Sequence, residues 1–407
     1  MSLPVPLMLK KAAVPPEKRL GRDVKLLLAM HALYQLGSSM AGVFLNLYLW
    51  RLTQSVWVNG MYTLLSVTAG VAGFALSGWL GKRKHSLLPY RLGVFLSALF
   101  YLIVIALQEN VVVYYPIVAL VAGLIGGTYW VGFLVLSYDV TTEHNRLGFF
   151  GINTVTFTFA GLVGPALAGW MISRSEGLAG YMITFAVAFF TFAASVCVTL
   201  AMKGKAASHK GYFLMSVPRL LRTKPEWTRS LYGFLVLGLF QGVMLFLPNI
   251  LLYQATGRED SVGYLTILLS VTGMLSGMIQ ARIGRPELNK AYAFMAAGGL
   301  LLGSMLLVMD VNLVTVLIFL VLNSFVAPWQ SNSLSTYHYK TIAQLPLRGQ
   351  LRVESMVVRE LFLSIGRAVS ILLLIGSADN LSGYVLGVVM IGLALTQFVL
   401  PYCFGRE

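Results

Sequence analysis

Residues 178–202 read LAGYMITFAVAFFTFAASVCVTLAM and contain no charged side chain. At a rise of about 1.5 Å per residue, a helix of this length crosses the roughly 30 Å hydrocarbon core of a bilayer. A helix on the surface of a soluble bundle would instead show a polar face. The stretch therefore predicts a transmembrane helix.

The composition of the whole chain agrees with a membrane protein. Of its 407 residues, 57% are hydrophobic and 11% are charged, whereas soluble domains have about 25% charged residues. The net charge of +15 is typical of nucleic-acid binding only in a soluble protein, and here the basic residues lie in short loops between apolar runs. Cys197 and Cys403 fall in apolar runs without metal-site spacing. We expect no nucleic-acid partner, no metal and no cofactor.

Twelve apolar runs are each long enough to span a bilayer. The first six lie near 24–50, 56–81, 87–107, 111–138, 147–173 and 178–202. The second six lie near 230–256, 261–283, 289–309, 312–337, 351–377 and 381–404. We therefore predict an all-α membrane protein with twelve transmembrane helices in two six-helix halves, 24–202 and 230–404.

The basic residues of the loops fall mainly on one side of the predicted membrane. With twelve crossings, only Arg51, Arg174 and Arg258 lie in loops on the other side. Basic loops stay in the cytoplasm, so we expect both termini there, in a monomer in the plasma membrane. Residues 1–23 are predicted to be a cytoplasmic tail, because they lack the apolar core of a cleaved signal. Residues 203–229 form the linker, which either rests on the membrane surface or is a solvated connector.

The two halves share sequence at a nearly constant offset. Leu64–Thr68 recurs as Leu268–Thr272, and both segments read LLSVT. Arg146 stands eighteen residues before Gly164, and Arg348 stands eighteen residues before Gly366. Several matches in order at corresponding helix ends indicate an internal duplication. Duplicated halves with a substrate path between them are a recurrent plan of transporters.

Six plus six helices, a basic central loop and a parallel repeat together resemble the major facilitator superfamily over nearly the whole chain. The loop after the second span resembles that family's signature, without its aspartate, through Gly73, Gly78, Gly81, Lys82, Arg83 and Lys84. The fifth span reads GLVGPALAG over residues 161–169 and resembles the glycine-proline motif of the family's exporters. The fourth span lacks the arginine of its proton-driven drug antiporters.

The glycines of the fifth span also have a physical interpretation. Gly161 and Gly164 let a neighbouring helix approach closely, and Pro165 frees a backbone carbonyl and bends the helix. This motif therefore predicts either a packing seam or, through the resemblance, an efflux transporter.

The resemblance implies that the first, fourth, seventh and tenth spans line a central cavity. Polar side chains in these spans need a wet or paired environment, and aromatic side chains would form the cavity wall, although packing and the interfacial belt account for about half of such rings. The predicted substrate-binding residues in these spans are Tyr34, Gln35, Ser38, Tyr129, Trp130, Gln241, Asn249, Trp329, Gln330 and Tyr337.

Charged residues inside the spans are few. Arg359 and Glu360 open the eleventh span, and Arg367 lies about two turns deeper. Glu360 is predicted either to carry a proton or to form a structural ion pair at the inner gate. Arg367 is predicted to bind an anionic group of the substrate, to pair with a carboxylate or to bond backbone carbonyls.

Further titratable residues lie near the inner ends of the first, fourth and fifth spans. His31 is a candidate proton carrier, because an unperturbed histidine titrates near pH 6.5, and the alternative is a hydrogen-bonded interfacial histidine. Asp139 and Arg146 look like partners in gate ion pairs, by spacing and by the family resemblance.

These observations predict a secondary transporter that works by alternating access, with proton-coupled export of a small organic solute. The alternatives are uptake of a sugar or polar metabolite, lipid or glycolipid flipping, and a non-transporting membrane sensor. Since neither a phosphate-binding GxxxxGK[ST] loop nor a reactive cluster occurs in the sequence, we expect neither an ATP-driven pump nor an enzyme.

Overall fold

The computed structural model describes residues 21–85, 87–141, 143–203, 211–283, 286–346, 351–376 and 383–405. The tail residues 1–20 and the linker residues 204–210 lie outside these ranges. The helices of the first half are α1 (Arg22–Thr53), α2 (Val56–Arg83), α3 (Leu87–Leu107), η2 (Gln108–Val112), α4 (Tyr115–Val140), α5 (Glu143–Ser173) and α6 (Ala179–Leu200).

The linker contains two short helices, η3 (Leu214–Ser216) and α7 (Val217–Thr223). The helices that follow are α8 (Pro225–Met244), α9 (Leu247–Thr256), α10 (Glu259–Ile283), η4 (Pro286–Leu288), α11 (Asn289–Met309), α12 (Leu313–Ala343), α13 (Arg352–Gly376), α14 (Gly383–Thr396) and η6 (Gln397–Cys403). The predicted seventh span is thus divided between α8 and α9. Pro248 lies in the first turn of α9, where its missing N–H is tolerated, whereas it would break a continuous helix.

The all-helical membrane fold predicted from the sequence is confirmed. Within the described residues, 11 helical segments are long and apolar enough to cross a membrane. Helix α13 is not among them, although it has 25 residues. It carries the charged residues Arg352, Glu354, Arg359, Glu360 and Arg367. The predicted eleventh span is therefore set apart by its charge and not by its length.

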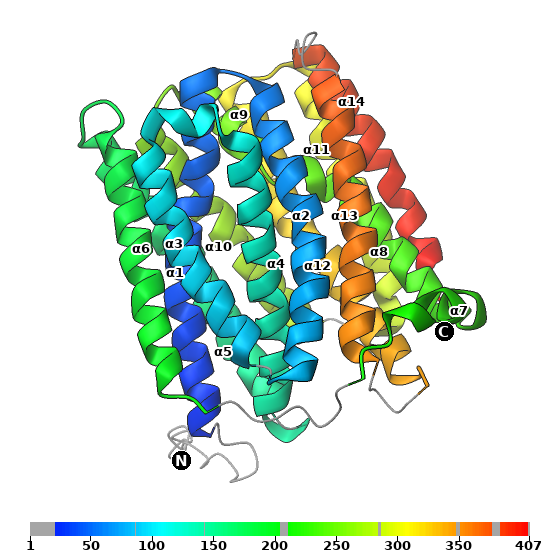
Figure 1. The fold of residues 1–407 in the computed structure, drawn as a ribbon. Helices are drawn as coiled ribbons and strands as arrows, with labels where there is room; N and C mark the ends of the chain where they lie inside the picture. The colour runs from blue at the N-terminus through cyan, green and yellow to red at the C-terminus, as the bar shows by residue number, and fades with distance from the viewer. Residues whose placement is uncertain are drawn as a thin grey trace, which may run out of the picture.

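The two halves stand side by side, and α1 begins at the same end of the bundle at which η6 ends (Figure 1). We call this the terminal end and the other the distal end. Towards the distal end, one apolar cluster joins the halves and includes Phe44 of α1, Leu251 of α9 and Ile371 of α13. Gly60 of α2 lies so close to Ile375 of α13 that a side chain at Gly60 would collide with it.

The glycine-proline segment of α5 packs against both halves. Gly164 lies against Ser39 of α1, and Pro165 approaches Gly263 of α10. Proline at position 165 leaves the carbonyl of Gly161, four residues earlier, without its helical N–H. The Ser270 hydroxyl of α10 donates to that carbonyl at 3.2 Å. Ser270 belongs to the repeated LLSVT segment, so the repeat supplies the hydrogen bond that the proline removes.

Candidate functional site

Two adjoining cavities lie between the halves and within the first half. The larger, about 290 Å³, is bounded by α1, α2, α4 and α13, with Trp130, Glu360 and Arg367 among its lining residues. The smaller, about 200 Å³, lies among α1, α2, α3, α4 and α6. Both are lined by Asn46, Tyr62, Ala122 and Gly126. We call the two together the hollow.

Glycines on α4 explain why the hollow is open where it is. Gly127 lies against the backbone of Gly70, so α2 and α4 pack closely there. The preceding residue, Gly126, lines both cavities. No other group lies within 4 Å of the position that a Cβ atom would occupy there. Gly42 of α1 likewise faces open space and lines the smaller cavity. The absence of side chains at these two positions leaves room for a solute.

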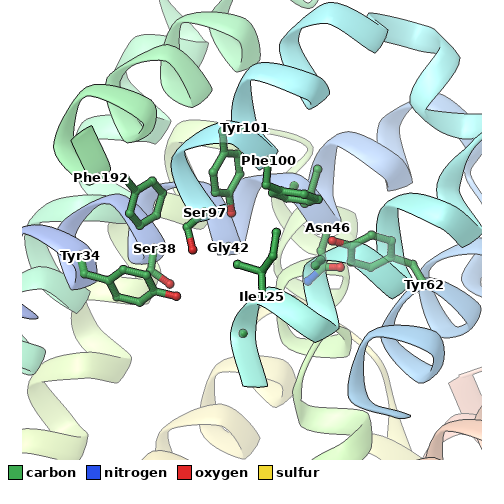
Figure 2. Close-up of a pocket in the computed structure, with 13 residues that line it drawn as sticks. Tyr34, Ser38, Gly42, Asn46, Tyr62, Ser97, Phe100, Tyr101, Ile125 and Phe192 are labelled. Carbon is green, nitrogen blue, oxygen red and sulfur yellow. The ribbon is translucent and has the colours of Figure 1, made fainter. Parts of the chain in front are cut away.

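The wall on the first-half side is aromatic and polar but uncharged. Figure 2 shows Tyr34, Ser38 and Tyr101 on one side of the smaller cavity and Asn46 with Tyr62 on the other. The amide oxygen of Asn46 is buried and has no hydrogen-bond partner among the described residues. Because Asn46 also lines both cavities, this oxygen is a candidate acceptor for a donor group that displaces its present neighbours.

The charge in the hollow comes from α13 of the second half. The Arg367 guanidinium donates to Glu360 at 3.2 Å, and the two side chains are 20% and 18% exposed. Arg367 also donates to the amide oxygen of Gln241 on α8 at 3.1 Å. Gln241, predicted to bind substrate directly, thus orients Arg367. Near this pair, the Arg359 guanidinium lies 4.5 Å from the centre of the Phe234 ring.

The predicted residues of α1 and α4 divide between the hollow and the interior of the first half. Tyr34, Ser38 and Trp130 line the hollow. His31, Gln35 and Tyr129 are buried and line neither cavity. His31 bonds the Tyr129 hydroxyl through Nδ1 and Gln35 through Nε2, and the His31 ring stacks on Phe133 at 3.9 Å. His31 therefore has the hydrogen bonds expected of the alternative, a hydrogen-bonded interfacial histidine, and its role stays a prediction.

On α12 the structure differs from the expectation that Trp329, Gln330 and Tyr337 face the cavity. Gln330 donates to Gln397 of η6 at 3.0 Å. The Trp329 ring lies 4.7 Å from that of Tyr292 on α11, and the Tyr337 hydroxyl accepts the N–H of Gly405. All three predicted residues are buried within the second half. Partners satisfy the Gln330 amide and the Tyr337 hydroxyl there, whereas the Trp329 Nε1 is buried without a hydrogen-bond partner among the described residues. Asn249 lies half-buried on α9 and lines neither cavity.

A second ion pair joins the halves at the terminal end. Lys82 of α2 contacts Glu354 of α13 at 2.5 Å and donates to the Gly211 carbonyl of the linker at 3.0 Å. The same carboxylate accepts the N–H of Phe213 at 2.8 Å, and the Tyr212 hydroxyl donates to the Ala75 carbonyl of α2. We call these residues the latch. Burial and the nearby Glu354 charge raise the pKa of Tyr212.

The latch gives a role to the signature-like loop that the sequence analysis noted. Gly78 leaves room for Val353 and Tyr212, and Lys82 provides the ion pair. The Arg83 guanidinium lies over Trp79 at 4.4 Å. Glu354 was not predicted from the sequence as a functional residue. The sequence could have indicated it, because Glu354 is an acidic residue in the first turn of a span, at the same end of the bundle as Lys82.

The predicted gate pair near the end of α4 has one described member. Asp139 is exposed at the end of α4. The side chain of Arg146 lies outside the described part of the structure. This pair therefore stays a prediction.

Comparison with known proteins agrees with the architecture. An uncharacterized Bacillus subtilis (strain 168) protein, YqgE, is 28% identical over 348 residues, which cover 85% of this chain and 80% of that protein. The human organic anion transporter MFSD10 has a similar fold, with a TM-score of 0.67 at 17% identity over 95% of this chain and 100% of that one. A D-xylose–proton symporter gives a TM-score of 0.66 at 14% identity over 92% of this chain and 97% of that one.

The sequence model of the Major Facilitator Superfamily matches residues 27–370, which is most of the chain. This match confirms the resemblance drawn from the signature-like loop and the repeat. Members of this family are transporters and not enzymes, and their substrates are small molecules. The chain is therefore an integral membrane protein that belongs to the major facilitator superfamily of secondary transporters.

Proposed function

We propose that the protein moves a small organic solute through the hollow by alternating access, with Glu360 as the proton carrier. The observation that carries the proposal is the meeting of the two halves at one cavity, where α1, α2 and α4 face the Glu360–Arg367 pair. Ionisable groups inside a membrane are costly and mark solute or proton paths. Rocking of the halves about this cavity would expose it to each side in turn.

The size of the hollow favours a small solute. Its cavities of about 290 and 200 Å³ lie at or below the lower end of the roughly 300–1,000 Å³ range of ligand pockets. Aromatic walls with the free amide oxygen of Asn46 fit a solute that has both apolar and polar parts.

Protonation of Glu360 offers a route for coupling. As a carboxylate, Glu360 holds Arg367 in the observed ion pair. A protonated Glu360 loses the charge on which that pair depends, so Arg367 becomes free for another partner. Proton binding would then change the affinity of the same cavity for solute.

Two directions of transport compete within this proposal. Export is supported by the glycine-proline motif of α5, and uptake of a sugar or polar metabolite by the uncharged polar wall of the hollow. The basic residues at the terminal end support a cytoplasmic location of both termini in the plasma membrane. Lipid flipping and solute sensing without transport are further hypotheses, and a sensor would bind solute without exchanging it.

The test is solute counterflow in proteoliposomes against a panel of small organic solutes, with Glu360→Gln beside the wild type. We expect the variant to keep counterflow and to lose accumulation driven by a pH gradient. Glu176→Gln, an exposed loop carboxylate, is the control and should behave like the wild type. Unchanged pH-driven accumulation in Glu360→Gln would remove Glu360 as the proton carrier, and absence of any exchange by the wild type would overturn the proposed function.

A further inference from the structure

The charges on the stretch of α13 beside the hollow are unevenly balanced. Among the described residues that line the hollow, Glu360 is the one carboxylate and Arg367 is the one cation. Arg359 precedes Glu360 on the same helix and has no ion pair among the described residues, its guanidinium lying over Phe234 instead. Two cations therefore accompany one carboxylate on this stretch of α13.

Within the part of the chain that the structure describes, the neighbouring helices bring no compensating negative charge to these cations. Among the described residues, α2 and α4 bring Tyr62 and Trp130 to the hollow, and α1 brings Asn46. From α8, Gln241 and Phe234 face the cations, and His338 of α12 lies behind Phe234 and bonds Ser230. Since none of these groups is acidic at neutral pH, the region keeps an excess positive charge in a low-dielectric setting.

Arg367 has donors to spare. Its two terminal nitrogens each make one hydrogen bond, to Glu360 and to Gln241. Its Nε is buried and has no partner among the described residues. Glu360 therefore holds the guanidinium through one oxygen, and not in the two-bond arrangement that carboxylates form with arginine. Such a single contact is easier to replace than a paired one.

We infer that the solute carries a carboxylate or a similar planar anionic group, which replaces Glu360 on Arg367. The apolar part of the solute would then lie against Tyr62, Phe74 and Trp130, which line the same cavity. This inference rests on the proposed function and adds the chemical class of the solute. Glu360 competes with the solute for Arg367. Glu360 is a strong competitor while its carboxylate is ionised and a weak one when it is protonated.

Two consequences distinguish this arrangement from a general polar site. A cationic solute is repelled by Arg367 in the hollow and by the charge of Arg359 behind it, which is unpaired among the described residues. Replacement of Glu360 by glutamine, which removes the charge and keeps a polar side chain, strengthens the binding of an anion. In a site that recognised cations or neutral amides, the same substitution would weaken binding or leave it unchanged.

Benzoate, benzamide and benzylammonium are matched probes, because they share a ring and differ mainly in charge. Their binding to the purified full-length protein in nanodiscs is measured by calorimetry at neutral pH. For the wild type, we expect benzoate to bind at least about tenfold more tightly than either other probe, a difference of roughly 1.4 kcal/mol. In Glu360→Gln, benzoate should bind about three- to tenfold more tightly than in the wild type, because its competitor is lost.

Two substitutions of Arg367 complete the test. Arg367→Gln should abolish the preference for benzoate, and Arg367→Lys, which keeps the charge without the planar fork, should restore part of it. A preference of the wild type for benzylammonium or benzamide, weaker benzoate binding in Glu360→Gln, or no benzoate binding by either protein would each overturn the inference.

The outcomes also separate this inference from the proposed function. Counterflow of a neutral or cationic solute, together with failure of benzoate to bind, leaves a transporter of another substrate class. Benzoate binding with the expected effects of substitution, but no counterflow of any solute, leaves an anion-binding membrane protein that does not transport.

Discussion

Two carboxylates on α13 lie less than two turns apart and have opposite surroundings. Glu354 has a side chain that is 1% exposed, and it binds Lys82 of α2 and the backbone of the linker. Glu360 is 18% exposed, lines the hollow and pairs with Arg367 of its own helix. The comparison teaches that position in a span does not decide the role of a charge. A carboxylate with partners on other elements holds those elements together, whereas one that faces a cavity can change partners.

Removal of the buried carboxylate should have the largest effect on stability. Glu354→Ala breaks the buried ion pair with Lys82, and loss of one member of such a pair costs about 3–5 kcal/mol. We expect a lower free energy of unfolding in mixed micelles, measured by denaturant titration. The exposed Glu176→Ala is the control. Equal stability of the two variants would show that the latch does not hold the halves together.

Removal of the cation in the hollow should affect transport more than stability. Arg367→Gln would lose the charge-assisted bonds that we infer to the solute, worth about 1.5–3 kcal/mol each, so solute exchange should fall by about tenfold to hundredfold in proteoliposomes. The thermal unfolding midpoint should change less than in Glu354→Ala. Full exchange by Arg367→Gln would place the solute elsewhere.

Filling the hollow without touching either ion pair sharpens the comparison. Gly126→Val adds a side chain where the structure has open space and therefore reduces the volume for a solute. We expect a fall in exchange of about tenfold, equivalent to roughly 1.4 kcal/mol, with normal folding. Gly298→Val is the matched control, since Gly298 also faces open space but lies away from the hollow. The two variants would behave alike if Gly126 had no contact with the solute path.

The smallest effect concerns the linker side of the latch. Tyr212→Phe removes the hydroxyl that donates to the Ala75 carbonyl, at a cost of about 1 kcal/mol. Because the pKa of Tyr212 is raised, its contribution is fully present below about pH 10, the ordinary tyrosine value, and is lost as the pH rises further. The measurement is the free energy of unfolding of the wild type and of Tyr212→Phe across this pH range. The difference between the two free energies should become smaller only in strong alkali.

The sequence predicted the spans well because their length and apolar character are local properties. It also predicted that Pro165 frees a carbonyl, but the donor, Ser270, became visible only when α5 and α10 were packed together. Within the site, Tyr34, Ser38, Trp130 and Arg367 were predicted and line the hollow.

Other site residues were not predictable from one helix at a time. Tyr62 and Ser66 line the larger cavity, but the family resemblance directed attention to four other spans. Gln330 looked like a cavity residue because its partner, Gln397, is far away in the sequence. A polar side chain in a span indicates that a partner exists and does not say whether that partner is water, solute or another helix.

Thiol accessibility tests most directly whether the hollow, and not the interior of the second half, is the solute path. Ser66 of α2 lines the hollow, whereas Ser333 on the polar stretch of α12 is 2% exposed. Ser66→Cys and Ser333→Cys are made in a background with Cys197→Ala and Cys403→Ala and treated with a charged thiol reagent in proteoliposomes. We predict that the cysteine at position 66 reacts and is protected by transported solute, while that at 333 stays unmodified. Reaction at 333 with protection by solute, and none at 66, would contradict the account.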